Sequence, residues 1–354
     1  RASKTACGFL VGHSVGRPLS GNVSKRCGGD AGLGLFWADQ YPFFYAALIK
    51  ATRSWGGDTQ QGLAYGLLDG GRGLIAAVLA SVGVFAFSIT FPLGYDAATL
   101  PQKAEVLRQV IYGYTAVTAA VGFVVWFTLR GLDGEQTGEQ SAPVSHFFRQ
   151  IKHVIRLRVV WLQSTVLICA YTSYKAFDQY ALFAVRGHGI DEVDAAQMVA
   201  VGAWARPVAA LGLGLLGDRL GISRMALLCF VLLIFSHSLF AFTSNAMGSL
   251  TLILLNTLVT CIAIFGLRGL YFGLLQEGQI PLAFTGTAVG LVSVLGYAPD
   301  IYIAAVAGFL IDRSPGLEGF QHLFMLLLGF SIAGAIAAIL FEREAKRAPG
   351  HLPV

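Results

Sequence analysis

Charged residues are scarce in this sequence. Asp, Glu, Lys and Arg make up 13% of its 354 residues, whereas hydrophobic residues make up 55%. The mean hydropathy of +0.65 is well above that of a soluble globular domain. Apolar runs of about 20 residues, the length a helix needs to cross roughly 30 Å of hydrocarbon, recur along the chain. The composition therefore predicts an all-α polytopic membrane protein.

Several other patterns are missing. The sequence has no short segments of alternating apolar and polar residues, which a transmembrane barrel requires. Its five cysteines form no CxxC pair and no metal-ligand spacing, so we expect small core residues and no metal or other cofactor. The formal net charge is +5, but Lys and Arg fall between apolar runs and not on one basic face. That distribution is typical of membrane topology and excludes a nucleic-acid partner.

Two motif matches do not predict an enzyme. The sequence GHSVG, Gly12 to Gly16, fits the GxSxG nucleophile elbow, but that elbow needs a preceding strand and only eleven residues come before it. The sequence GLGLLG, Gly212 to Gly217, fits the GxGxxG dinucleotide motif but closes an apolar helix instead of following a strand. We therefore expect no enzymatic activity.

The apolar runs divide the chain into five regions. Residues 1–30 start with Arg1 instead of Met and hold no run long enough to span, so we expect a non-membrane, aberrant or disordered start. The remaining regions are a helical part at 31–130, a linker at 131–158, a six-helix part at 159–345 and a tail at 346–354. About nine spans are predicted, at 31–49, 61–93, 108–129, 159–185, 196–216, 225–243, 249–274, 284–311 and 321–341.

The linker and the basic residues set the expected orientation. The second half of the linker predicts an amphipathic helix, with Phe147, Ile151 and Ile155 on one face and Lys152 and Arg156 on the other. Such a helix suits an anionic headgroup surface, although a plain solvated linker helix is the alternative. Most Lys and Arg fall on the side of the linker and the tail. This predicts a multi-pass inner-membrane protein with a cytoplasmic linker and C-terminus.

A short internal repeat is also present. QGLAYGLL, Gln61 to Leu68, and TGTAVGLV, Thr285 to Val292, share Gly, Ala, Gly and Leu at the same offsets. Each stands at the start of a span that follows a polar loop. Parallel half-repeats of this kind are typical of transporters, but GxxxG also recurs in membrane helices because small residues allow close packing.

Charges inside the predicted spans are the strongest functional signal. A charge at the bilayer centre costs about 2.5–3.5 kcal/mol on insertion scales, so such residues usually face a bundle interior, a water-filled cavity or a partner. Lys175 and Asp178, in the segment YTSYKAFDQY, are three residues apart and should pair on one helical face. The other charges inside the spans are Arg72, Arg206, Arg268 and Asp300.

One loop resembles a known family. LGLLGDRLGISR, Leu213 to Arg224, is similar to the GxxxDRxG loop of the major facilitator superfamily, with Gly214, Asp218, Arg219 and Gly221 in register. Ile222 and Ser223 stand where the family usually has two basic residues. The stretches AALIKATRSWGG, QGLAYGLLDGGRGL, ARPVAALGLGLLGDR, RGLYFGLLQEGQIP and GTAVGLVSVLGYAPD look like a bacterial branch near the organic-anion and sugar-phosphate transporters.

The resemblance covers about residues 31–345 and implies a partial major facilitator fold. The spans would be helices four to twelve of twelve, with helices one to three missing. In that register the charges fall on the helices that line the central path of the superfamily. The implied function is secondary transport of a small organic anion by alternating access, with proton coupling, by a monomer in the bilayer. The alternatives are a transporter-fold membrane sensor and a non-functional fragment of a transporter.

The expected roles follow from charge and register. Lys175, Arg206 and Arg268 are candidate substrate-binding residues, because cations in a cavity suit an anion. Asp178 and Asp300 are candidates for proton coupling, although Lys175 and Asp178 could be a static pair, and Asp300, after Pro299 in a kinked helix, could instead pair with Arg268. We expect Arg72 at a cytoplasmic gate. By resemblance, the loop residues Gly214, Asp218, Arg219 and Gly221 would act in gating.

Overall fold

The computed structural model describes residues 45–90, 99–129, 144–190, 192–242, 250–281, 284–314 and 316–347. In these ranges the regular structure is helical, without strands. The chain forms two compact units. The predicted all-α class is therefore confirmed for the described residues, and the expectations for residues 1–30 and for most of span 31–49 lie outside them.

The described part of the smaller unit holds the end of α4 (Gln61–Thr90) and α5 (Leu100–Leu129). These two helices meet at Gly83, where an added Cβ would lie 2.7 Å from the hydroxyl of Tyr114. The Tyr114 hydroxyl donates a hydrogen bond to the carbonyl of Leu79. A small residue on α4 thus admits the aromatic side chain of α5.

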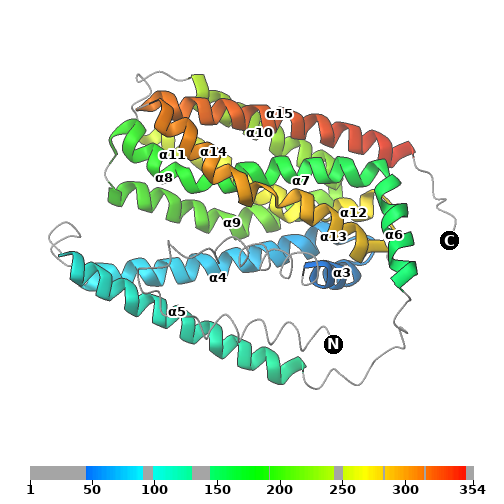
Figure 1. Cartoon of the computed structure of the whole chain (residues 1–354), viewed down its shortest axis with the longest axis horizontal. Helices are drawn as coiled ribbons and strands as arrows, with labels where there is room; N and C mark the ends of the chain where they lie inside the picture. The colour runs from blue at the N-terminus through cyan, green and yellow to red at the C-terminus, as the bar shows by residue number, and fades with distance from the viewer. Residues whose placement is uncertain are drawn as a thin grey trace. The chain divides into compact units, whose positions relative to one another are not determined.

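The larger unit contains residues 41–77 and 148–354. Its long helices pack as neighbours, with α10 against α15, α9 against α11, and α7 against α15 (Figure 1). The helices of this unit, besides the start of α4, are α3 (Tyr45–Gly56), the part of α6 (Val144–Arg156) from Phe148 onward, α7 (Arg158–Ala176), α8 (Tyr180–Leu182), α9 (Glu192–Leu220), α10 (Ile222–Phe242), α11 (Leu250–Leu270), α12 (Leu274–Glu277), α13 (Thr285–Gly296), α14 (Pro299–Arg313) and α15 (Leu317–Arg347).

Six helical stretches among the described residues are long and apolar enough to cross a membrane. They are Gln61–Gly83, Gln197–Leu220, Ile222–Phe242, Thr251–Leu270, Thr285–Arg313 and Leu317–Arg347. A pair bent by 76°, Gln150–Arg156 with Arg158–Gly187, raises the number to seven if it is one span. The chain is therefore a multi-span membrane protein; the predicted span 108–129 lies within α5, which is not among the six.

Three predicted spans are interrupted helices. The span 159–185 leaves the α-helix at Ala176, inside YTSYKAFDQY, and continues through a 3₁₀ turn at Phe177–Gln179 and a π-helical turn at Phe183–Gly187. The span 249–274 ends its long helix at Leu270. The span 284–311 breaks between Gly296 and Pro299, because proline cannot donate the backbone hydrogen bond that would continue α13. The helix is therefore interrupted just before Asp300, where a kink was expected.

The core of the larger unit is apolar and aromatic. Phe183, Phe240 and Phe324 pack with ring centroids 4.8–5.1 Å apart, and Tyr180 packs edge-on against Phe324 at 5.5 Å. These rings come from the end of the α7–α8 segment, from α10 and from α15. They tie the interrupted helix to two continuous ones, and Tyr174 of α7 packs against Phe265 of α11.

Candidate functional site

A buried cluster of charge joins α4, α9 and α11. Arg206 on α9 forms a bidentate pair with Asp69 on α4, with Nε 3.1 Å from Oδ2 and Nη2 2.8 Å from Oδ1. Arg268 on α11 donates from Nε to Oδ1 of the same carboxylate at 3.2 Å. The side chains of Asp69, Arg206 and Arg268 are 7%, 14% and 8% exposed. Two guanidinium groups therefore share one buried carboxylate.

Small residues bring α4 and α9 close enough for this pairing. An added Cβ at Gly66 would lie 2.6 Å from the carbonyl oxygen of Ala210, and one at Gly73 would lie 2.6 Å from the side chain of Arg206. Ala210 also faces α11, where a Cβ at Gly269 would lie 3.0 Å from its carbonyl oxygen. Close backbone approach of this kind is how membrane helices associate through small residues. The GxxxG pattern of the repeat thus serves packing in α4.

The guanidinium of Arg268 stacks on a tyrosine ring, and one of its donor atoms has no partner among the described residues. Its guanidinium carbon lies 4.0 Å from the centroid of the Tyr174 ring and 5.8 Å from that of Tyr171. Both tyrosines are on α7. Nη1 of Arg268 is buried and donates no hydrogen bond to any of the described residues. A buried guanidinium N–H without an acceptor is costly, so this atom is the strongest candidate contact for an acidic ligand.

A second charged cluster joins α7 to α14. The Nζ of Lys175 lies 3.3 Å from Oδ2 of Asp178 and 3.4 Å from Oδ1 of Asp300. The hydroxyl of Tyr171 donates to Oδ2 of Asp300 at 2.9 Å. The expected pair between Lys175 and Asp178 is thus present, and Lys175 has a further partner in Asp300. Asp178 is 64% exposed in its side chain, against 16% for Asp300.

Tyrosines connect the two clusters. Tyr171, which contacts Asp300, packs edge-on against Tyr297 at 4.6 Å between centroids. The hydroxyls of Tyr297 and Tyr271 lie 3.2 Å apart, and Gln163 donates to the carbonyl of Tyr271 at 2.9 Å. The break between α13 and α14 places Tyr297 beside Asp300. Tyr171 contacts both Asp300 and Arg268, so tyrosine side chains link the two sets of charges.

The predicted gating loop caps a helix far away in the sequence. Asp218, near the end of α9, accepts hydrogen bonds from the backbone N–H groups of Gly62 at 2.6 Å and Leu63 at 2.8 Å. These N–H groups belong to the first turn of α4, where backbone donors have no acceptor within the helix. A negative charge is also favourable at the start of a helix. Gly214 lies so close to Gly62 that neither position has room for a Cβ.

The remaining loop residues differ in position. Gly221 has φ +100°, a backbone conformation that glycine adopts without strain, and it separates α9 from α10. Arg219 is exposed at the end of α9. The loop therefore presents Asp218 and Gly214 to α4, whereas the side chain of Arg219 faces outward.

Arg53 on α3 lies at the same end of α4 as Asp218, near Gln61. Its guanidinium donates to the hydroxyl of Thr285 at 2.5 Å, to Oε1 of Gln276 at 2.8 Å and to the carbonyl of Ile280 at 2.5 Å. The side chain of Gln61 donates to the carbonyl of Arg53 at 2.8 Å. Burial lowers the pKa of Arg53 from its ordinary value. Arg53 thus contacts the first residue of each copy of the repeat, Gln61 and Thr285.

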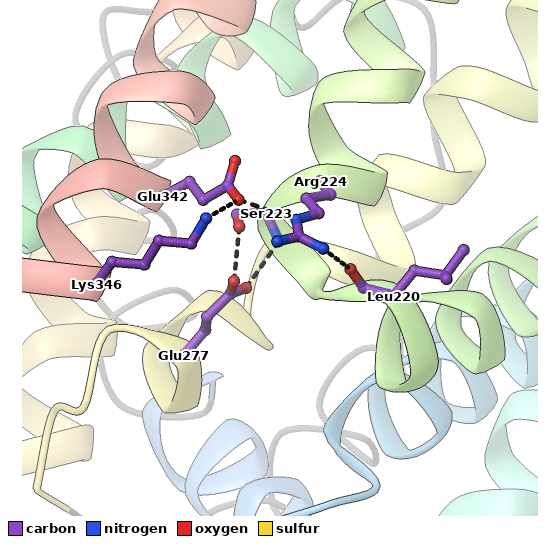
Figure 2. A network of polar contacts seen from close by, with 6 residues as sticks. All are labelled: Leu220, Ser223, Arg224, Glu277, Glu342 and Lys346. Carbon is purple, nitrogen blue, oxygen red and sulfur yellow. Dashed lines mark hydrogen bonds and ion pairs between the residues drawn. The ribbon is translucent and has the colours of Figure 1, made fainter.

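A further polar network lies beside it, between α10, α12 and α15 (Figure 2). Glu277 accepts hydrogen bonds from the backbone N–H of Ser223 at 2.7 Å and from its hydroxyl at 2.6 Å, and so caps the start of α10. Glu342 pairs with Arg224 at 2.9 Å and with Lys346 at 2.7 Å. Gln276 faces Arg53 while its neighbour Glu277 faces Ser223, which makes the short helix α12 the link between α3 and α10.

The structure brings together some predicted residues and separates others. Arg206 and Arg268 meet at one carboxylate, whereas Lys175, Asp178 and Asp300 form another group. Arg72 is the twelfth residue of α4, one turn beyond Asp69, and hence beside the buried cluster and not at the helix start where Asp218 binds. The ion partner of Arg268 is Asp69, and the ion partner of Asp300 is Lys175.

Sequence reasoning missed two residues. Asp69 lies in the apolar span that begins at Gln61, only three residues before Arg72, and an acidic residue at that depth was the available signal. Arg53 lies at the end of a short helix, where a basic residue reads only as a topology signal. No sequence pattern predicts the distant partners of either residue.

Comparison with known proteins gives two relatives and no family. The chain is 22% identical over 315 residues to the inner membrane protein YihN of Escherichia coli K12, covering 85% of this chain and 70% of that protein. It is 25% identical over 312 residues to the inner membrane protein YqcE of the same organism, covering 84% and 68%. No protein-family model matches the chain. Together with the membrane-spanning helices, these relatives support a multi-pass inner-membrane protein.

Proposed function

We propose that this chain is a secondary transporter of the major facilitator type that carries a small organic anion by alternating access. The observation that carries the proposal is the buried pair of arginines around Asp69, with Nη1 of Arg268 left without a partner among the described residues. Arginine binds carboxylate and phosphate through a planar fork of donors, and a membrane protein keeps such charges inside a bundle only at a cost.

The interrupted helices support the same proposal. The helix of YTSYKAFDQY leaves α geometry beside Lys175, and the break before α14 lies at Asp300. Transporters place their sites where helices are discontinuous, because backbone groups there can line a cavity. Lys175 would contribute to an electropositive path toward Arg268, with the tyrosines Tyr171 and Tyr297 as polar contacts for the rest of the solute.

The contacts of Asp218 and Arg53 near the start of α4 fit a gate. Asp218 on the start of α4, and Arg53 on Thr285 and Gln276, join segments that are far apart in the sequence. Alternating access requires such contacts to break when the path opens on their side. We place this end on the cytoplasmic side, together with the linker and the C-terminus. A C-terminal fluorescent-protein fusion that is dark in whole cells, with an active alkaline phosphatase fusion at the same point, would reverse that orientation.

The experiment that tests the function is solute uptake. The purified chain is first screened by thermal unfolding with sugar acids, sugar phosphates, dicarboxylates and uncharged sugars, and stabilising solutes are then tested in proteoliposomes. We expect an acidic solute to stabilise the protein and to accumulate inside the vesicles. Stabilisation by uncharged sugars alone, or binding of an acidic solute with no movement across the membrane, would contradict the proposed function.

A further inference from the structure

We propose that Asp69 is an internal competitor for the acidic group of the solute, and that it takes up a proton when that group replaces it on Arg206 and Arg268. This inference rests on the proposed function and concerns Asp69, a residue that the sequence analysis did not single out. It also moves proton coupling away from Asp178 and Asp300, where the sequence placed it.

The geometry of Asp69 is that of a bound ligand. Its two oxygens accept from both ends of the Arg206 fork, and Oδ1 also accepts from Nε of Arg268. A carboxylate or phosphate of a solute would use the same donors in the same plane. Nη1 of Arg268 has no acceptor among the described residues, so an entering oxoanion has one donor to bind before Asp69 leaves.

The charges that face Asp69 are mostly positive. Arg206 comes from α9, Arg268 from α11, and Arg72 from the next turn of α4, with an attractive influence on the carboxylate from all three. Tyr174 on α7 stacks on Arg268, and Tyr271 and Tyr297 face the same guanidinium. One carboxylate with two paired arginines has a net charge of +1, so the cluster itself favours an anion.

Displacement creates a need for a proton. A solute oxoanion that takes over both arginines leaves the Asp69 carboxylate in a site where its side chain is 7% exposed. An unpaired charge so deeply buried is strongly unfavourable, and a carboxyl group in that position becomes neutral by binding a proton. The proton comes from water on the open side of the membrane and binds an oxygen of Asp69. One proton therefore accompanies each acidic group that displaces Asp69.

Asp178 does not share this requirement. With 64% of its side chain exposed, it regains water when it loses Lys175 and needs no proton. Asp300 is more buried but keeps the hydroxyl of Tyr171 as a donor at 2.9 Å. The two residues are thus matched controls for Asp69, and Asp178→Asn removes a carboxylate of the same kind from a wetter place.

The test uses inorganic sulfate as a simple oxoanion. Thermal unfolding of the purified chain is measured near neutral pH in sulfate and in chloride at equal ionic strength, for wild type, Asp69→Asn and Asp178→Asn. In Asp69→Asn the two arginines lack their counter-ion, so we expect sulfate at about ten times its dissociation constant to raise the midpoint by about 3 °C more than in wild type. Asp178→Asn should respond as wild type does, which accounts for the general stabilising effect of sulfate.

Two further variants keep the test decisive. Adding Arg268→Ala to Asp69→Asn should remove the extra response to sulfate. If Asp69→Asn alone fails to insert, Asp69→Asn/Arg206→Gln keeps one arginine on Tyr174 and should show the response. The wild type should show the same extra response to sulfate as the pH falls to about 5, because the displaced carboxyl group of Asp69 binds its proton more readily there. Equal sulfate responses of wild type and both Asp69 variants at every pH would overturn the inference.

Failure of this inference can be told from failure of the proposed function. Gluconate and glucose 6-phosphate, tested side by side in proteoliposomes, also separate a carboxylate from a phosphate as the group that displaces Asp69. Uptake of either solute with the same pH dependence in wild type and Asp69→Asn would keep the transporter and reject the role of Asp69. A sulfate response of Asp69→Asn in a protein that moves no solute would keep the anion site and reject transport.

Discussion

Two groups of charge in the larger unit differ in how much water reaches them. The cluster of Asp69, Arg206 and Arg268 is sealed between three helices packed through small residues. The cluster of Lys175, Asp178 and Asp300 lies where two helices are broken, and its carboxylate at Asp178 is mostly exposed. Both groups pair oppositely charged residues, but the first is the more deeply buried, so its members regain less hydration when a partner is lost.

The difference shows why burial matters more than spacing for function. A pair such as Lys175 and Asp178 follows from sequence distance alone, and exposed pairs contribute only about 0–1 kcal/mol. Breaking a buried pair by removing one partner costs about 3–5 kcal/mol, because the other charge is left uncompensated. Under the proposed function, the sealed cluster would couple the binding of an anion to proton uptake, whereas the more exposed cluster would guide an anion inward.

The largest effect is expected at Arg268. Arg268→Ala removes Nη1, which donates to none of the described residues, and one of the two arginine partners of Asp69. Uptake of the acidic solute should therefore fall by about 10- to 150-fold, the equivalent of roughly 1.5–3 kcal/mol. The measurement is initial uptake in proteoliposomes at matched protein content. Arg313→Ala, on the exposed end of α14, is the control and should leave uptake unchanged. Equal losses in the two variants would show that the effect is not specific to the sealed cluster.

A second prediction concerns how the cluster is sealed. Gly214→Ala places a methyl group against the backbone of Gly62, so we expect a loss of about 1–3 kcal/mol in stability from overpacking. Gly212→Ala, two residues earlier on the same helix, meets nothing within 4 Å and should be neutral or slightly stabilising. Thermal unfolding in detergent compares the two. Similar midpoints for both variants would mean that α4 and α9 do not pack through these glycines.

Lys175 should matter less than Arg268. Its side chain is partly exposed, so Lys175→Ala should lower uptake by about fivefold, near 1 kcal/mol, through loss of positive charge on the path. Lys175→Arg keeps the charge and should restore most of the activity. A loss as large as that of Arg268→Ala, with no rescue by arginine, would place the primary anion contact at Lys175 instead.

The smallest effect is expected at Asp178. Asp178→Asn removes an exposed carboxylate whose partner Lys175 still has Asp300, so uptake should change less than about twofold at any pH. The pH profile of uptake is the informative measurement, because a proton carrier would alter its shape. A profile that becomes flat in Asp178→Asn would return proton coupling to Asp178.

Local features of this chain were predictable from its sequence. Run length predicted the six membrane-crossing stretches, the offset of three predicted the pair of Lys175 and Asp178, and Pro299 predicted the break before Asp300. Partners across helices were not predictable, because periodicity tells which face of a helix is apolar but not which helix it meets. Asp69 lies 137 residues from Arg206 and 199 from Arg268, and Asp218 caps a helix 156 residues away. Such contacts come from tertiary packing alone.

The most direct test of the central claim is an electron-microscopy structure of the purified protein with a transported acidic solute bound. We expect the oxoanion of the solute within hydrogen-bond distance of Nη1 of Arg268, and Asp69 displaced from both arginines. A bound solute with the contacts from Asp69 to Arg206 and Arg268 intact, at 2.8 Å and 3.2 Å, would contradict the account.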